Sequence, residues 1–214
     1  MITLSAFRSV PPFAQGQVRD LRARWALEEA GLPYQAKLIS QKDKATPAYR
    51  ELQPFGQVPM FEEDGLVLFE SGSIVLHIGE RCEVLLPRDP KTRARAITWL
   101  FAALNTIEVL IQPLAEIDFF YRDQEWAKLR RPSLEKAVRK RLSELAAVLG
   151  DREYLEERFT VGDLMMTTVL RILNHTDILD AEPKLKAYKE RGEARPAFQR
   201  ALAAQLASFE KWEG

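Results

Sequence analysis

The sequence is poor in the residues that build disulfide frameworks and metal sites. Its 214 residues include one cysteine, Cys82, and two histidines, His77 and His175. A single cysteine forms no internal disulfide, which fits a reducing compartment such as the cytoplasm. The histidines lie far apart in the sequence, and neither has a second His or Cys at metal-ligand spacing. We therefore expect no disulfide and no metal cofactor.

The sequence also lacks the features that are typical of nucleic-acid-binding and membrane proteins. The 31 Lys and Arg residues equal the 31 Asp and Glu residues, whereas a general nucleic-acid binder usually carries a basic excess. The N-terminus has no basic segment followed by an apolar run, and no apolar run approaches the roughly 18–20 residues of a membrane span. Neither a nucleophile elbow nor a phosphate-binding loop is present. These features favour a cytoplasmic enzyme or binding protein without nucleic-acid or membrane partners.

The first eighty residues combine strand and helix patterns. Residues 2–7 and 34–39 are rich in strand-forming residues, and the apolar residues between them recur at helical spacing. Gly31 followed by Pro33 is typical of a helix C-terminus. A strand, a crossover helix and a second strand predict a parallel, right-handed unit.

Three more elements follow in this region. Thr46 before Pro47 indicates the capped start of a short helix. Residues 59–69 predict a hairpin that turns at Asp64 and Gly65, and Ser71 is positioned to cap a third helix. The predicted order is β-α-β-α-β-β-α.

The remainder of the chain has helical patterns. We expect a long helix that Pro113 kinks or interrupts, and a second that ends at Gly150. Thr160 and Asp163 form the sequence signature of a helix capping box. The basic stretch 128–141 is interpreted as the solvated face of a helix, with an anion-binding surface as the alternative.

Two short stretches carry the clearest chemical signal, QPFGQVP at 53–59 and FESG at 69–72. Pro59 has no N–H, so the backbone of Val58 is a place where the chain is free to bond something else. Glu70 and Ser71 stand where a strand gives way to a helix, whose first N–H groups and a hydroxyl suit a carboxylate. Glu70 suits an ammonium group, so the pair predicts recognition of an α-amino acid. The alternative is that Ser71 only caps the helix.

These motifs, in this order, resemble the cytosolic glutathione transferases over nearly the whole chain. QPFGQVP stands for the family's Asn-Pro-x-Gly-x-Val-Pro, and FESGSI for its Glu-Ser-x-x-Ile. The late Pro…Arg-Pro pattern appears within residues 180–198. The resemblance implies an α+β protein, with a thioredoxin-like N-terminal domain over 1–82, a linker over 83–89 and an all-helical domain over 90–214. It also implies a homodimer that uses glutathione as a co-substrate.

The resemblance carries glutathione-binding roles onto five residues. Glu70 and Ser71 match the positions that hold the γ-glutamyl end of glutathione. Val58 matches the residue before a cis-proline, whose backbone pairs with the cysteinyl part. Gln57 and Lys44 match positions near the glycyl carboxylate.

The resemblance also places a second substrate against an apolar wall from the long helix, with Phe101 and Asn105 as candidates. The group that activates the thiol departs from the family pattern. Counting from the first strand selects Ser9, with Arg8 as an electrostatic helper, whereas counting back from the helix selects Gly16 or Gln17.

The resulting hypothesis is a glutathione transferase involved in detoxification, which activates the thiol of glutathione for attack on an electrophilic apolar small molecule. A thiol is made reactive by lowering its pKa. The alternatives are a glutathione-dependent isomerase or peroxidase/disulfide reductase on the same scaffold, and a non-catalytic binding or regulatory protein.

Overall fold

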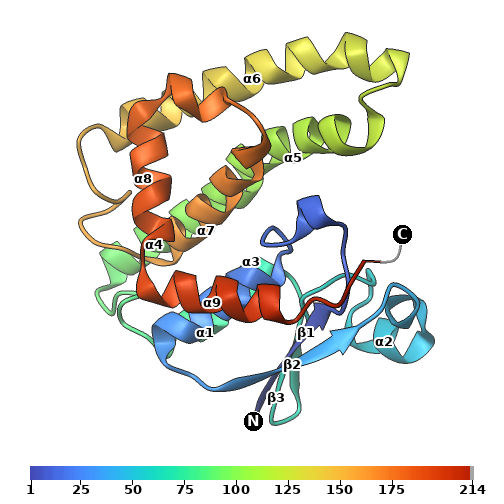
Figure 1. Cartoon of the computed structure of the whole chain (residues 1–214). Helices are drawn as coiled ribbons and strands as arrows, with labels where there is room; N and C mark the ends of the chain where they lie inside the picture. The colour runs from blue at the N-terminus through green and yellow to red at the C-terminus, as the bar shows by residue number, and fades with distance from the viewer. Residues whose placement is uncertain (213–214) are drawn as a thin grey trace. The chain divides into compact units, whose positions relative to one another are not determined.

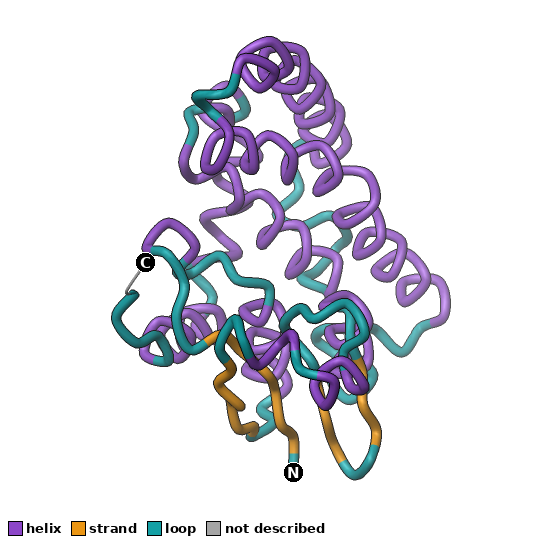
Figure 2. Tube along the Cα trace, turned by 90° about the vertical axis from the view of Figure 1, so that its right-hand side faces the viewer, coloured by secondary structure: helices purple, strands orange, loops and turns teal. Residues whose placement is uncertain are grey.

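The computed structural model describes residues 1–212, which pack as two compact units (Figure 1). The sheet unit comprises Met1–Leu86 together with the chain from Ala194 onward. The helical unit comprises Pro87–Glu193. Within the described residues the strands belong to the sheet unit alone (Figure 2).

The sheet unit contains a four-stranded mixed sheet in the order β2-β1-β3-β4. Its strands are β1 (Ile2–Phe7), β2 (Tyr34–Ile39), β3 (Phe61–Glu63) and β4 (Leu66–Leu68). The parallel β1–β2 pairing and the antiparallel β3–β4 hairpin are both as predicted. Asp64 and Gly65 have φ values of 50° and 83°, the positive pair that a tight hairpin turn requires.

The helices of this unit are α1 (Asp20–Ala30), α2 (Pro47–Leu52), α3 (Ser71–Gly79) and α9 (Pro196–Ala207). Two 3₁₀ turns, η1 (Pro12–Ala14) and η2 (Asp43–Ala45), complete it. The hydroxyl of Thr46 accepts the Tyr49 N–H at 3.3 Å, so the predicted cap of α2 is confirmed.

The last helix, α9, packs against α1 (Figure 1). The rings of Trp25 and Phe198 meet edge to face with centroids 4.8 Å apart. Arg195 donates to both carboxylate oxygens of Glu29 at 2.6 and 2.8 Å. The range 90–214 expected for a helical domain includes α9, whereas these contacts group α9 with the sheet.

The helical unit is built from α4 (Pro90–Ala102), α5 (Val109–Glu116), α6 (Glu125–Leu149), α7 (Val161–Leu170) and α8 (Pro183–Glu193). Two π-helical segments, η3 (Ala103–Glu108) and η4 (Ile117–Tyr121), and two 3₁₀ segments, η5 (Arg171–His175) and η6 (Ile178–Ala181), join them. Every residue of α7 is buried, so α7 forms the centre of this core. Gly150 ends α6 with φ 60°, as predicted.

Residues 90–121 form one long helical run in which π turns replace regular α-helix twice. Pro113 lies inside α5, and the interruptions fall on either side of it. By length and composition this run could cross a membrane, which contradicts the expectation that no apolar segment is long enough. Core helices of soluble proteins pass the same test, so the finding is weak evidence for a membrane span.

The predicted capping box at the start of α7 is present. The Oγ1 of Thr160 accepts the Gly162 N–H at 3.2 Å, and Asp163 Oδ2 accepts the Thr160 N–H at 2.9 Å. Asp163 Oδ1 accepts from the Leu155 N–H at 2.8 Å and from the Tyr188 hydroxyl at 2.9 Å. Burial raises the pKa of Asp163, and these hydrogen bonds oppose the rise. One buried carboxylate thus joins α7, α8 and the preceding loop.

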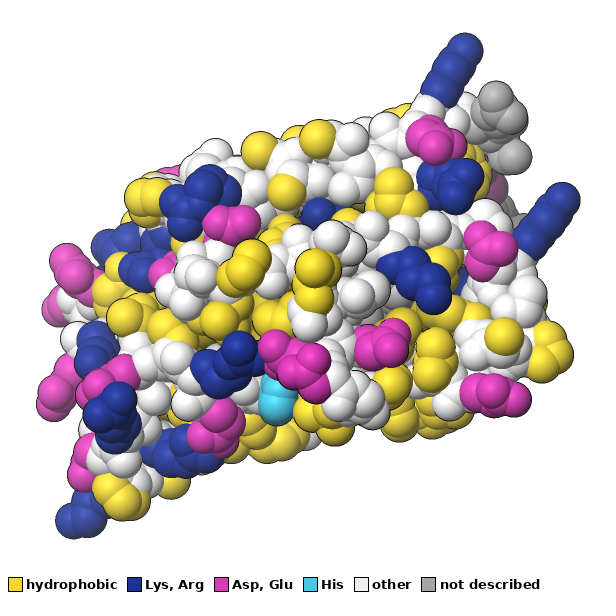
Figure 3. Space-filling view, turned by 90° about the horizontal axis from the view of Figure 1, so that it is seen from below, with side chains coloured by type: hydrophobic (Ala, Val, Ile, Leu, Met, Phe, Trp, Pro, Cys, Tyr) yellow, Lys and Arg dark blue, Asp and Glu magenta, His cyan; other side chains and the backbone are white. Residues whose placement is uncertain are grey.

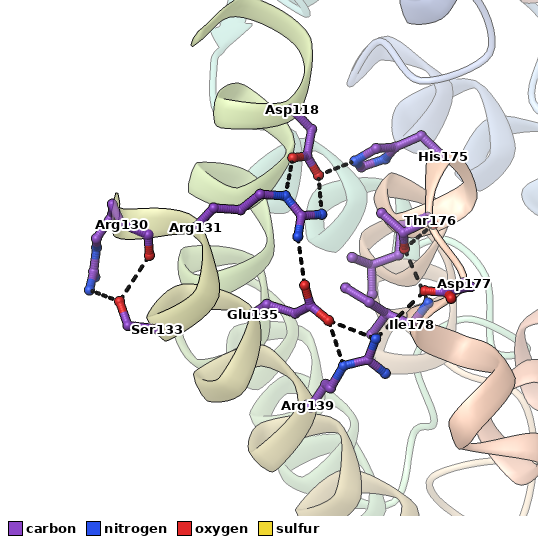
Figure 4. Close-up of polar contacts among 11 residues, drawn as sticks. Asp118, Arg130, Arg131, Ser133, Glu135, Arg139, His175, Thr176, Asp177 and Ile178 are labelled. Carbon is purple, nitrogen blue, oxygen red and sulfur yellow. Dashed lines mark hydrogen bonds and ion pairs between the residues drawn. The ribbon is translucent and has the colours of Figure 1, made fainter. Parts of the chain in front are cut away.

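A second polar cluster joins η4, α6 and η5 (Figure 4). Arg131 donates to Asp118 through Nε at 2.5 Å and Nη2 at 3.0 Å, and to Glu135 through Nη1 at 2.6 Å. His175 Nε2 lies 3.1 Å from Asp118 Oδ2. Arg139 bonds Glu135 at 2.8 Å. This cluster ties the end of the long helical run to its neighbours.

Other basic side chains of the stretch 128–141 also have carboxylate partners on α6. Lys128 lies 2.6 Å from Glu125, and Arg141 lies 3.0 Å from Glu144. This pairing favours a solvated helix face over an anion-binding surface. Charges of both signs are likewise mixed over the face drawn in Figure 3, with hydrophobic side chains between them.

We expect Asp163→Ala to lower the free energy of unfolding by about 2–4 kcal/mol, because it removes a cap and leaves buried donors without acceptors. Asp151→Ala is the matched control, since the Asp151 side chain is 96% exposed and should change stability by less than about 0.5 kcal/mol. Urea unfolding measures both variants. Equal effects of the two substitutions would contradict the structural role of the capping box.

The cluster of Figure 4 also predicts a pH dependence. Burial raises the pKa of Asp118, but hydrogen bonds from Arg131 and His175, then their charges, outweigh it and hold the pKa below its usual 3.8. Asp118 therefore contributes stability above that value and loses it as the pH falls through the lowered pKa. We expect Asp118→Asn to flatten the loss of unfolding free energy in acid. An unchanged acid profile in urea unfolding would rule out this contribution.

Candidate functional site

A chain of hydrogen bonds connects the middle of the sheet to the loop that precedes β3. The Met60 N–H donates to Ser5 Oγ at 2.7 Å, and Ser5 Oγ lies 2.8 Å from the Tyr49 hydroxyl. The Tyr49 hydroxyl donates to the Gln57 carbonyl at 2.7 Å. Because tyrosine has one hydroxyl proton, Ser5 is the donor to Tyr49. Ser5 is fully buried and its hydroxyl is used in this chain, so it is a structural residue.

The loop QPFGQVP is shaped by its own first residue. Gln53 is buried, and its Oε1 accepts the Phe55 N–H at 2.8 Å. Its carbonyl accepts the Gly56 N–H at 2.9 Å, and Gly56 has φ 60°, in the region that favours glycine. The Val58–Pro59 peptide bond is cis, as the resemblance implied.

The backbone of Val58 lies where the sheet ladder ends. The next residue but one, Met60, still accepts the Ser5 N–H at 2.8 Å, whereas Pro59 has no N–H. Within residues 1–212, neither the N–H nor the carbonyl of Val58 is hydrogen-bonded to the protein. Its side chain packs in a cluster with Ile39, Tyr49 and Met60. Val58 thus presents a fixed backbone edge with its polar groups unused.

Glu70 and Ser71 lie at the start of α3, but their positions in the helix cap differ from those predicted from the sequence. Glu70 is the N-cap residue, and its φ of 68° is rare for a residue with a side chain. Neither side chain caps α3, so the expectation that Ser71 caps this helix is wrong. Ser71 is the first helical residue, and its hydroxyl accepts a hydrogen bond from Arg22 instead. The first N–H groups of α3 are therefore available to an external acceptor.

The structure brings the two signal stretches together. The rings of Phe55 and Phe69 lie edge to face with centroids 5.9 Å apart, which links the loop before Val58 to the residue before Glu70. Arg22 and Ser71 are buried, with 3% and 6% of their surfaces exposed, whereas Glu70 is exposed.

The two residues matched to the glycyl end also belong to this region. The Nζ of Lys44, in η2, lies 5.6 Å from the centre of the Phe7 ring, and Phe7 packs on the cluster that contains Val58. Gln57 has an exposed side chain, while its carbonyl accepts from Tyr49. Their roles toward a ligand stay predictions.

The residues proposed to activate a thiol follow β1. The Arg8 N–H donates to the Ile39 carbonyl at 2.9 Å, and the Arg8 carbonyl accepts the Glu210 N–H at 2.8 Å. Ser9 is half-buried, and its hydroxyl donates to the Lys211 carbonyl at 3.5 Å, a long hydrogen bond. The segment after α9 therefore contacts the loop that contains both candidates. The rival positions, 16 and 17, lie closer to α1.

Phe101 and Asn105 are both exposed, in α4 and η3 of the helical unit. Their role in a second-substrate site stays a prediction. Among the described residues, no group of three or more His, Cys, Asp or Glu side chains has the arrangement of a metal site.

Tyr49 and Arg22 are the residues of this region that the sequence did not indicate. Each forms a hydrogen bond with a residue far away in the sequence. Tyr49 is 44 residues from Ser5, and Arg22 is 49 residues from Ser71. No local spacing could have found these pairs. The burial of the charged Arg22 in α1 is visible only in three dimensions.

Comparison with known proteins identifies the family. Residues 14–80 match the glutathione S-transferase N-terminal domain, and residues 110–205 match a glutathione S-transferase C-terminal domain. A glutathione S-transferase of Hyoscyamus muticus is 28% identical over 201 residues, covering 85% of this chain and 92% of that protein.

Solved structures share the fold. A glutathione transferase family member from Pseudomonas fluorescens Pf-5, crystallised with two glutathione bound, is 24% identical with a TM-score of 0.82, covering 94% of this chain and 92% of that one. The theta class glutathione S-transferase of Xanthomonas axonopodis pv. citri, with glutathione bound, is 27% identical with a TM-score of 0.79, covering 96% and 98%. With both domain models matched in order and a thioredoxin-like sheet unit preceding a helical one, this chain belongs to the glutathione S-transferase family.

Proposed function

We propose that the protein binds glutathione and activates its thiol for attack on an electrophilic apolar small molecule. The observation that carries the proposal is the unused backbone edge of Val58 at a cis Val58–Pro59 bond, beside an uncapped α3 N-terminus. The relative from Xanthomonas axonopodis, at 27% identity, has glutathione bound.

Glutathione offers one group for each feature of this region. Its cysteinyl residue has a backbone N–H and carbonyl, which pair with the carbonyl and N–H of Val58 as a short extension of the ladder. Its γ-glutamyl end carries a carboxylate and an ammonium group. The carboxylate binds the α3 N–H groups and the Ser71 hydroxyl, and the ammonium binds the Glu70 carboxylate.

The glycyl carboxylate is the second negative group of glutathione. In the proposal it binds Lys44 and the side chain of Gln57. Both lie around the cluster that contains Val58. The peptide is thus held along its length by groups from η2, the loop before β3 and α3.

Catalysis requires that the bound thiol lose its proton near neutral pH. A free thiol has a pKa near 8.5, and a hydroxyl that donates to the thiolate lowers it. Ser9 supplies that hydroxyl in the proposal, and the charge of Arg8 adds to the effect. Ser9 then donates to sulfur in place of the Lys211 carbonyl, whose 3.5 Å hydrogen bond is weak.

The electrophile and the assembly are further parts of the proposal. Phe101 and Asn105 contribute an apolar wall with one polar group, the usual composition of a small-molecule site. The protein acts as a homodimer. Phe55, which lies in the same loop as Val58 and is 60% exposed, is an apolar side chain suited to an interface.

One observation favours a non-catalytic member of the family as the second candidate. The Ser9 hydroxyl is already bonded to the segment after α9. If that hydrogen bond persists when glutathione is bound, the protein binds glutathione without activating it. Analysis of the reaction products separates transferase activity from isomerase and reductase activities, because it distinguishes glutathione conjugates from isomers and from glutathione disulfide.

We expect Ser71→Ala and Glu70→Ala each to weaken glutathione binding by about tenfold to a hundredfold, because each removes a hydrogen bond to a charged group of the ligand. Ser73→Ala is the matched control, an exposed serine on the same helix, and should bind as the wild type does. Isothermal titration calorimetry measures all three. Unchanged affinity in both site variants would show that glutathione binds elsewhere.

We expect Ser9→Ala to leave glutathione affinity unchanged and to raise the pKa of the bound thiol by about one to two units, the value of one hydrogen bond to a charged group. Conjugation at neutral pH should slow in proportion. The thiolate absorbance of the complex, titrated against pH, measures the shift. An unshifted titration with intact turnover would remove Ser9 from the mechanism and direct attention to residues 16 and 17.

A further inference from the structure

The loop that presents Val58 is held by two neighbouring residues of α2. On the buried side of the loop, the Tyr49 hydroxyl donates to the Gln57 carbonyl at 2.7 Å. On the exposed side, Arg50 Nη1 donates to the Pro54 carbonyl at 2.8 Å. The two carbonyls lie three residues apart in the loop, so α2 fixes the loop backbone at two separate points.

The guanidinium of Arg50 also lies against the backbone of Gly56. A Cβ atom added to Gly56 would be 2.7 Å from the Arg50 Cζ and 2.8 Å from its Nε, which is closer than van der Waals contact allows. Glycine therefore serves two purposes at this position. It adopts the φ of 60°, and it leaves the space that the guanidinium fills.

Arg50 has the position of a surface residue, but its contacts are those of a loop support. It is exposed, and exposed charged side chains usually contribute little to the stability of the fold. Among the described residues, the Pro54 carbonyl is its hydrogen-bond partner, and no carboxylate pairs with it. The side chain thus restricts the backbone of the loop and does not neutralise a neighbouring charge.

This restriction acts close to the backbone edge that the proposed function uses. Gly56 precedes Val58 by two residues, and the carbonyl of the intervening Gln57 is held by Tyr49. With both sides of the loop fixed, the loop has its binding shape before the ligand arrives. The entropy of ordering the loop then does not reduce the affinity.

We infer that Arg50 is a positioning residue that holds the Val58 loop in its glutathione-binding conformation without touching the ligand. The inference rests on the proposed function, in which the Val58 backbone pairs with the cysteinyl part of glutathione. Because bound glutathione itself orders the loop, loss of Arg50 weakens binding but leaves the saturated complex as it is in the wild type.

Arg50→Ala should weaken glutathione binding by about threefold to tenfold, the value of one hydrogen bond, with kcat at saturating glutathione within about twofold of wild type. The loss should persist in about 0.5 M salt, which screens long-range attraction to the charged ligand but not a short-range contact. The Tm should change by less than about 2 °C. Isothermal titration calorimetry, steady-state kinetics and thermal unfolding measure these three quantities.

Gly56→Asn tests the close approach separately from backbone strain. Asparagine tolerates a positive φ, but its Cβ occupies the space of the Arg50 guanidinium. The substitution should weaken binding by about threefold to tenfold in the wild type, and by less than about twofold in the Arg50→Ala background, where that space is free.

The matched control is Glu51→Ala, an exposed neighbour on the same helix, which should bind as the wild type does. Unchanged affinity in Arg50→Ala, a loss that disappears at high salt, or an equal cost of Gly56→Asn in both backgrounds would overturn the inference. A large fall in Tm in Arg50→Ala would also overturn it, since Arg50 would then support the fold as a whole. Absence of glutathione binding by the wild type would overturn the proposed function itself.

Discussion

The hydrogen-bond chain from Met60 through Ser5 and Tyr49 to Gln57 is the constraint on which the proposed site depends. Met60, Ser5 and Tyr49 are buried, and each contact has a defined direction because the tyrosine proton is given to the Gln57 carbonyl. The chain joins β1, α2 and the loop before β3. Loss of any one member would leave a buried polar group unsatisfied, which costs more than the hydrogen bond itself contributes. The loop that presents Val58 is therefore held by the sheet.

The start of α3 is the second part of the same arrangement. Glu70 adopts a positive φ, a conformation that persists in residues with side chains only where the surroundings enforce it. It leaves the helix without a side-chain cap, and the neighbouring Ser71 is bonded to Arg22. A charged ligand group would complete the helix terminus. The contact between Phe55 and Phe69 keeps this terminus beside the Val58 loop, so one extended peptide can reach both.

The sequence predicted what local patterns control. Strand periodicity and the Asp64–Gly65 turn predicted the strands and the hairpin, and the spacing of Thr160 and Asp163 predicted the capping box. Each of these features depends on residues that are at most a few positions apart. The sequence could not indicate that Glu70, and not Ser71, would be the N-cap, since glutamate is disfavoured at positive φ. The pairs Ser5–Tyr49 and Arg22–Ser71 join distant segments and become visible only once the sheet and α1 are packed. The return of α9 to α1 is equally non-local.

The central claim is that glutathione lies along the Val58 edge with its γ-glutamyl end at the start of α3. A crystal structure of the protein with glutathione tests this most directly. The account predicts that the cysteinyl backbone pairs with the N–H and carbonyl of Val58, and that the glutamyl carboxylate lies within hydrogen-bond distance of the Ser71 hydroxyl. Glutathione bound elsewhere, with Val58 still unpaired in an otherwise unchanged loop, would contradict it.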